Sequence, residues 1–217
     1  INNLMKHFDR EYNPVFNAVA HRVFNNFRRE ELPLFIEKLN RVSDSHNNPF
    51  FTDYIKYRMI MLNLVARGEY QGKVEDSVII NSKFNYANPA YIDLIDQLFT
   101  GYFRILAAGD MRQAYYEALI HSSLDTLRDV IRHDGKISDT RLADYVILQN
   151  LFPEYFTGTI PREIIFKIIT DLKSKGSSDF IRSVASESIK RLEVYTRGRS
   201  LPDIGMIQSD GGGIQMS

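Results

Sequence analysis

Apolar residues recur along most of the chain at intervals of three and four positions, the spacing that places side chains on one face of an α-helix. The pattern is clearest after two similar phrases, Asn-Pro-Phe-Phe-Thr-Asp-Tyr-Ile at 48–55 and Asn-Pro-Ala-Tyr-Ile-Asp-Leu-Ile at 88–95. Asparagine is a good helix N-cap, and proline at the first helical position costs no hydrogen bond. We therefore predict two central helices, one that ends at Gly68 and one that extends to about Leu106.

Each predicted central helix carries one apolar stripe of the kind that packs against a core. The first stripe consists of Phe51, Tyr54, Ile55, Leu62 and Val65, and the second of Tyr91, Leu94, Ile95, Leu98, Tyr102 and Leu106. Arg58 falls on the first stripe, where a charge has to be paired or reach solvent through its stem. We expect an ion pair between Arg58 and Asp93 or Asp96; the alternative is an anion-binding arginine in an aromatic groove.

Helical periodicity continues on both sides of this pair. Before it we expect a weak helix over 4–12, a third Asn-Pro start that opens a helix over 13–29, and a shorter helix over 33–42. After it the predicted helices cover 109–120, 123–131, 139–155, 161–172 and 177–195. Pro153 should kink the helix that contains it or end it as a loose turn.

Residues 69–87 lack a helical stripe and are long for a loop without structure in a compact domain. We interpret this segment as an ordered crossing connection that places Ile79 and Phe84 under the helices. After Gly198 the periodicity is lost, and five of the twelve glycines fall in the last twenty residues. We therefore divide the chain into a helical domain, 1–197, and a Gly-rich flexible tail or linker, 198–217.

About nine helices joined by short turns, without a convincing strand pair, predict an all-α fold. It is either an irregular multi-helix bundle or an array of antiparallel helical hairpins. The three Asn-Pro starts lie 35 and 40 residues apart, close to the period of helical-hairpin repeats. The later helices do not keep the phrase, so we interpret the chain as a degenerate stack of helical hairpins.

Composition narrows the classes of function. Twenty-seven basic and twenty-seven acidic residues leave no net charge, which disfavours nucleic acid as a partner. No apolar run approaches the roughly 20 residues of a membrane span, so we expect none in this chain. The absence of cysteine excludes disulfides, thiolate chemistry and Cys-ligated zinc within these residues.

No pattern of residues predicts a reaction. The five histidines form no pair at i, i+4 and belong to no His-Glu-x-x-His array; they are His7, His21, His46, His121 and His133. The sequence also lacks G-x-S-x-G, and the glycines at 211–213 lack the lysine and helix of a phosphate loop. We predict no catalytic, cofactor-binding or metal-binding residues, no cofactor, and no enzyme activity for this chain. A helical enzyme that uses scattered carboxylates or a metal stays open as a further hypothesis.

Several phrases together resemble a known family. They lie at 48–58, 88–91, 126–129 and 145–148, and the most specific is Gly-Arg-Ser-Leu-Pro-Asp-Ile at 198–204, followed by Asp210-Gly211. This order resembles the N-terminal helical region that precedes the thioredoxin-like domain of TlpA-like thiol–disulfide reductases of some Gram-negative bacteria. The last phrase is similar to the G-x-x-A-P-D-F entry into that domain and to its first Asp-Gly turn.

The resemblance implies a non-catalytic accessory domain that positions or recruits a partner for a C-terminal thioredoxin-like module, whose Cys-x-x-Cys would lie downstream of these residues. It also implies a role in cell redox homeostasis and a periplasmic or cell-envelope location. The expected partner is a protein or peptide, or the C-terminal module itself. The alternative is a free-standing helical-repeat module that binds other proteins through a concave face.

Overall fold

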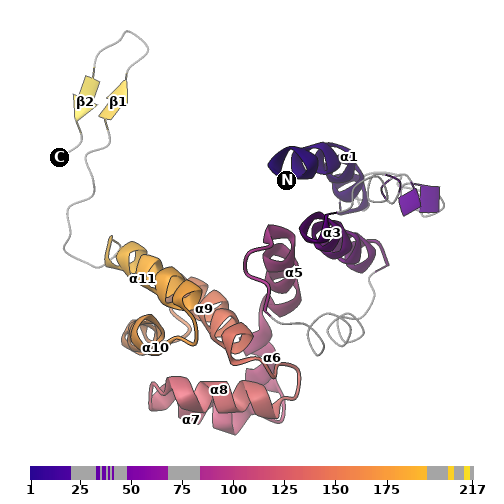
Figure 1. Ribbon diagram of the computed structural model, residues 1–217. Coiled ribbons are helices and arrows are strands. Elements are labelled where there is room, and N and C mark those ends of the chain that lie inside the picture. Colours follow the sequence, from indigo (N-terminus) through magenta and orange to yellow (C-terminus); the bar gives the residue numbers. More distant parts are fainter. Residues whose placement is uncertain are drawn as a thin grey trace.

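The computed structural model describes residues 1–20, 48–67, 84–194, 205–207 and 213–215, together with six single positions between 33 and 41. Its helices are α1 (Asn2–Ala20), α3 (Pro49–Arg67), α5 (Pro89–Phe99), α6 (Tyr102–Ala108), α7 (Arg112–Ile120), α8 (Leu124–His133), α9 (Thr140–Thr157), α10 (Arg162–Lys175) and α11 (Asp179–Val194). Figure 1 shows them as an irregular helical bundle, which confirms the predicted all-α class. The single positions described between 33 and 41 are all helical, as predicted for that segment.

The repeated Asn-Pro phrase starts two neighbouring helices, as predicted. Asn48 Oδ1 accepts a hydrogen bond from the N–H of Phe51 (3.0 Å), and Asn88 Oδ1 accepts one from the N–H of Ala90 (3.1 Å). Asn88 is fully buried, and its Nδ2 also donates to the carbonyl oxygen of Phe50 at 3.4 Å. The second cap therefore also ties the start of α5 to the first turn of α3.

The third Asn-Pro phrase does not start a helix, so this prediction was wrong. Helix α1 runs without a break from Asn2 through Pro14 to Ala20. A proline inside a helix removes one backbone hydrogen bond, and packing has to offset that cost. Here Phe8, Tyr12, Val15 and Val19 form one buried face, and α1 packs against α3. The predicted end of this helix, near 29, lies outside the described residues.

The second predicted central helix is in fact two helices, because the backbone takes a left-handed conformation at Gly101 (φ 72°). The side chain of Asn150 on α9 satisfies backbone groups on both sides of this break. Its Nδ2 donates to the carbonyl oxygen of Phe99 at 3.0 Å, and its Oδ1 accepts from the N–H of Phe103 at 3.4 Å. The apolar stripe nevertheless stays buried through both α5 and α6.

Two other helix boundaries in the structure also differ from the predicted ones. Helix α7 begins at Arg112 and not at 109, because Gly109 serves as the C-cap of α6. Helix α9 continues past Pro153 to Thr157, where Gly158 ends it in a left-handed conformation (φ 75°). The proline lies in the last part of a helix that packs against several others, so one lost hydrogen bond does not end it.

The helix at the centre of the residues 84–194 is α9, which contacts α5, α8, α10 and α11. The sequence had indicated α3 and α5 as the central pair. Buried residues cover most of the circumference of α9, and only the face with Arg141, Tyr145, Gln149 and Phe152 is partly exposed. The buried residues are Leu142, Ala143, Asp144, Val146, Ile147, Leu148, Asn150, Leu151 and Tyr155. Periodicity predicted a helix over 139–155 but not its central position, because burial around most of a helix leaves little contrast between an apolar and a polar face.

Phe84, at the end of the predicted crossing connection, lies under the helices as expected. Its ring is buried and contacts the rings of Tyr91 (6.0 Å between centroids), Tyr145 (5.6 Å) and Phe180 (6.1 Å). It therefore joins α5, α9 and α11. Ile79 and most of this connection lie outside the described residues.

A short antiparallel strand pair, not predicted from the sequence, lies within the segment 198–217. Strand β1 (Gly205–Ile207) pairs with β2 (Gly213–Gln215), with Met206 opposite Ile214. Figure 1 draws the two strands in yellow near the C-terminus. The domain boundary predicted at 197 follows the end of α11 at Val194 and lies outside the described residues.

Candidate functional site

Arg58 is held by partners from three helices, and the predicted ion pair with Asp93 is confirmed. Its Nη1 lies 3.0 Å from Asp93 Oδ2, and its Nε donates to the hydroxyl of Tyr54 (3.2 Å). Asp9 Oδ1 lies 3.8 Å from the same Nε. The guanidinium also lies 5.6 Å and 5.3 Å from the ring centroids of Tyr12 and Tyr54. These contacts compensate its charge within the protein.

The two tyrosines beside Arg58, Tyr12 and Tyr54, are protonated at neutral pH. Burial, the largest cause, and the hydrogen bond to Asp9 raise the pKa of Tyr54 to about 12. Burial likewise raises the pKa of Tyr12 well above its ordinary value. The Tyr54 hydroxyl donates to Asp9 Oδ1 at 2.6 Å while accepting from Arg58. This chain of hydrogen bonds ties α1 to α3, and the ion pair with Asp93 extends it to α5.

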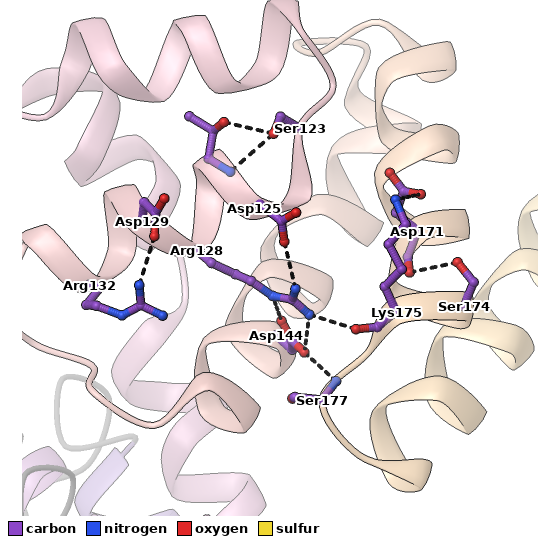
Figure 2. A network of polar contacts seen from close by, with 11 residues as sticks. Ser123, Asp125, Arg128, Asp129, Arg132, Asp144, Asp171, Ser174, Lys175 and Ser177 are labelled. Atoms are coloured by element: carbon purple, nitrogen blue, oxygen red, sulfur yellow. Dashed lines mark hydrogen bonds and ion pairs between the residues drawn. The ribbon is translucent and has the colours of Figure 1, made fainter.

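A second polar network, centred on Asp144, was not predicted. Figure 2 shows Arg128 pointing at this carboxylate, which is fully buried on α9. Arg128 donates from Nε to Oδ1 (2.6 Å) and from Nη2 to Oδ2 (2.9 Å), and the N–H of Ser177 donates to Oδ2 (2.8 Å). Arg128 also donates to the carbonyl oxygen of Lys175 and to Asp125. The network joins α8, α9 and the α10–α11 turn, and we interpret it as structural.

The histidines within the described residues lie on the surface. His7, His121 and His133 are exposed, and His133 Nδ1 lies 2.7 Å from the carbonyl oxygen of Asp129. His21 and His46 lie outside the described residues. Across the described ranges, His, Asp and Glu side chains form no group of three that could hold a metal ion. None of the helices described is both long and apolar enough to cross a membrane.

An apolar hollow of about 310 Å³ opens between α6, α7 and the connection from α9 to α10. We call it the α6–α7 groove. Its apolar lining includes Phe103, Ala107, Leu119, Ile120, Ile160 and Ile164. Tyr115 and Tyr116 also line it, and Arg104 and Glu154 supply its charged atoms. Volume and lining fit a site for one or two apolar side chains.

Two large apolar side chains of the α6–α7 groove are left open to solvent. Ile120, the last residue of α7, is 72% exposed, and Tyr116, one turn earlier, is 44% exposed. Their neighbours Leu119 and Tyr115 are buried and hold α7 against the bundle. Burying an isoleucine side chain completely contributes about 2 kcal/mol, so a partner that covers Ile120 gains a sizeable free energy.

The sequence contained a signal for this groove that the helix prediction did not use. Apolar residues occur in adjacent pairs on α7, Tyr115-Tyr116 and Leu119-Ile120. Neighbouring residues of a helix point about 100° apart, so a narrow buried face cannot take both members of each pair. One member of each pair is therefore left outside the core.

A more polar hollow of about 320 Å³ adjoins the α6–α7 groove and shares Phe103, Arg104 and Glu154 with it. Asp96 lines this second hollow, and its Oδ1 accepts a hydrogen bond from the hydroxyl of Tyr145 (2.8 Å). Burial, the largest cause, and the charge of Asp93 raise the pKa of Asp96 above its ordinary value. Asp96 is thus not the partner of Arg58, which uses Asp93.

A third hollow, of about 560 Å³, lies over the outer face of α10. Most of its lining is charged or polar, including Arg162, Lys167, Asp171 and Glu193, with Phe166 and Tyr155 as its apolar part. None of its lining residues is a large apolar side chain that the described structure leaves exposed, whereas the α6–α7 groove has Ile120 and Tyr116. The α6–α7 groove is therefore the better candidate site.

The chain was compared with family models, curated proteins and solved structures, and nothing matches it. The likeness to the helical region of TlpA-like reductases accordingly stays a prediction from the sequence.

Proposed function

We propose that this chain is a helical binding module that holds an apolar segment of a protein partner in the α6–α7 groove. The observation that carries the proposal is the grouping of exposed Ile120 and Tyr116 at the mouth of an apolar hollow. Single exposed apolar residues are ordinary on protein surfaces. Apolar residues that gather around a concave surface are typical of binding sites.

The geometry of the groove favours an anchor side chain over a flat interface. Its walls come from two consecutive helices, α6 and α7, and from the start of α10. Grooves between helices commonly receive one or a few apolar side chains of a partner's helix or extended segment. Ile120 and Tyr116 would then cover the anchor from the rim.

We propose further that the module serves a C-terminal thioredoxin-like thiol–disulfide reductase in the cell envelope, for which it positions or recruits the partner. The support is the resemblance of 198–204 and Asp210-Gly211 to the entry of that domain. The strand pair β1 and β2 adds to it, because the two strands flank Asp210-Gly211. A two-stranded sheet is marginal by itself and is stabilised when further strands pair with its edges.

The coding sequence downstream of Ser217 tests this second part. A Cys-x-x-Cys within about 100–150 residues, the length of one domain, is the expected result. A stop codon directly after Ser217 would contradict the reductase assignment. It would leave the alternative, a free-standing helical module for protein–protein interaction, which needs only the groove.

Selection from a random peptide library displayed on phage tests the groove itself. We expect the 217-residue chain to enrich peptides that share a bulky apolar position. The Ile120→Glu variant should not retain them, because a charge at the mouth cannot be desolvated cheaply. Leu34→Glu is the matched control, since Leu34 is 69% exposed and does not line the groove.

Two outcomes would contradict binding in the groove. In one, the wild-type chain enriches no peptide above background. In the other, the enriched peptides bind Ile120→Glu as tightly as wild type. Far-UV circular dichroism of both variants establishes that each has kept its helices before binding is compared.

A further inference from the structure

Two arginines flank the mouth of the α6–α7 groove, and neither has its charge fully compensated. Arg104 lines the groove from α6, and its side chain is 81% exposed. Its ion pair is with Glu154, at 3.8 Å between Nη2 and Oε1. That distance is too long for a hydrogen bond, so the guanidinium donors of Arg104 face solvent on this side.

The second arginine, Arg112, lies on the α7 side of the mouth. Its guanidinium carbon is 5.9 Å from the ring centroid of Tyr116, which lines the groove. Arg112 is exposed, and the described residues place no carboxylate within ion-pair distance of it. It occupies the first position of α7, where the helix dipole is positive and no side chain caps the helix.

Among the described residues that line the groove, Glu154 is the acidic one, and it is recessed. The side chain of Glu154 is only 15% exposed, and it lies between the groove and the polar hollow beside it. Glu117, the acidic residue of α7, does not line the groove and accepts a hydrogen bond from Gln113 Nε2 (3.0 Å). The rim that an approaching partner meets is therefore apolar and basic.

On the basis of the proposed function, we infer that the segment held in the groove is acidic: a bulky apolar anchor with aspartate or glutamate close to it in sequence. Carboxylates beside the anchor would meet Arg104 and Arg112 while the anchor fills the hollow. Both arginines offer several N–H donors in a planar arrangement that suits a carboxylate. A lysine- or arginine-flanked anchor would bring like charges together at the rim, which disfavours it.

The peptides enriched in the library selection test this inference. We expect aspartate and glutamate to be over-represented next to the shared apolar position, relative to the unselected library. For the tightest peptide, fluorescence anisotropy at low salt should show that changing the flanking acids to glutamine weakens binding about tenfold. Changing them to lysine should weaken it more. Both differences should shrink as the salt concentration rises, because exposed charges are screened.

Charge reversal in the protein supplies the complementary measurement. Arg104→Glu combined with Arg112→Glu should weaken binding of the acidic peptide and strengthen binding of its lysine version. Arg132→Glu is the control, because Arg132 is an exposed arginine of α8 outside the groove. If the doubly reversed chain does not keep its helices, Arg104→Gln with Arg112→Gln makes the same comparison with a smaller expected change.

The outcomes separate this inference from the proposed function. If no peptide is enriched, both the proposed binding function and the acidic preference are contradicted. A second outcome is that the enriched peptides depend on Ile120 but bind equally well with acidic, neutral or basic flanks. The groove then remains a binding site, and the acidic preference is overturned. Preference for basic flanks overturns it as well.

Discussion

At the scale of single residues, Asp144 is a buried polar group that joins three parts of the described fold: α8, α9 and the turn between α10 and α11. Its carboxylate is fully buried and accepts hydrogen bonds from Arg128 and from the N–H of Ser177. The side chain of Arg128 is itself largely buried. Removing one member of such a pair leaves the charge of the other desolvated and uncompensated. The network stabilises the fold only while both members are present.

We expect Asp144→Ala to lower the free energy of unfolding by about 3–5 kcal/mol, because Arg128 keeps its charge without its main partner. Asp125→Ala is the control, since this second carboxylate is exposed and its ion pair should contribute less than about 1 kcal/mol. Urea unfolding followed by circular dichroism measures both. Joint replacement, Arg128→Met with Asp144→Leu, should recover much of the loss; a double variant as unstable as Asp144→Ala would contradict this explanation.

Single residues also show where sequence reasoning works. The ion pair of Arg58 with Asp93 was predictable because a charge on an apolar stripe needs a partner on the facing helix. The sequence contained no comparable signal for Asp144. This residue lies on a helix that is buried around most of its circumference, so the sequence of α9 shows little contrast between an apolar and a polar face.

At the scale of elements, the break between α5 and α6 depends on a glycine and on a side chain from elsewhere in the sequence. The stripe of apolar residues continues across Gly101, so the local pattern predicts one helix. Asn150 on α9 bonds backbone groups at both sides of the break and makes the broken form favourable. The groove depends on this break, because α6 forms one of its walls.

We expect Gly101→Ala to destabilise the protein by about 1–2 kcal/mol, because an L-residue is strained in the left-handed conformation that Gly101 adopts. No atom lies within 4 Å of the added Cβ, so the loss should come from the backbone alone. Asparagine tolerates this conformation better than alanine, so Gly101→Asn should lose less stability than Gly101→Ala. Thermal unfolding of the two variants measures the order; an alanine variant as stable as wild type would show that a continuous helix is equally favourable here.

At the scale of the whole molecule, Asp96 within α5 and Asp139 at the N-cap of α9 make opposite contributions to the pH dependence of stability. Burial, the largest cause, raises the pKa of Asp96 above its ordinary 3.8. Burial also acts to raise the pKa of Asp139, but hydrogen bonds from Arg141 and from the N–H of Phe84 outweigh it and lower that pKa below 3.8. Stability supplied by Asp139 is present above pH 3.8 and is lost as the pH falls through its folded value.

We therefore expect Asp139→Asn to lower the free energy of unfolding at neutral pH and to reduce the loss of stability on acidification below about pH 4. For Asp96 the sign is reversed, because a raised folded pKa makes the ionised form the less stable one in the folded state. Asp96→Asn should stabilise the protein above the folded pKa of Asp96 and change little below pH 3.8. Urea unfolding at a series of pH values measures both; parallel curves for wild type and Asp139→Asn would contradict the assignment.

The sequence by itself determined the helical class and most helix starts. Asn48, Asn88, Ser123 and Asp139 cap helices where the pattern placed them, because a cap and the first turn that it satisfies are neighbours in the chain. Local chemistry of this kind needs no information from distant residues.

Only the tertiary structure decided that α1 runs through Pro14, that a helix breaks at Gly101 and that α9 is central. It also brought Arg104, Ile120 and Ile160 around one groove, although three different segments supply them. Burial and concavity depend on which surfaces meet across the core. Residues far apart in the sequence determine together which surfaces meet. The apolar periodicity of a single helix therefore does not predict where a groove forms.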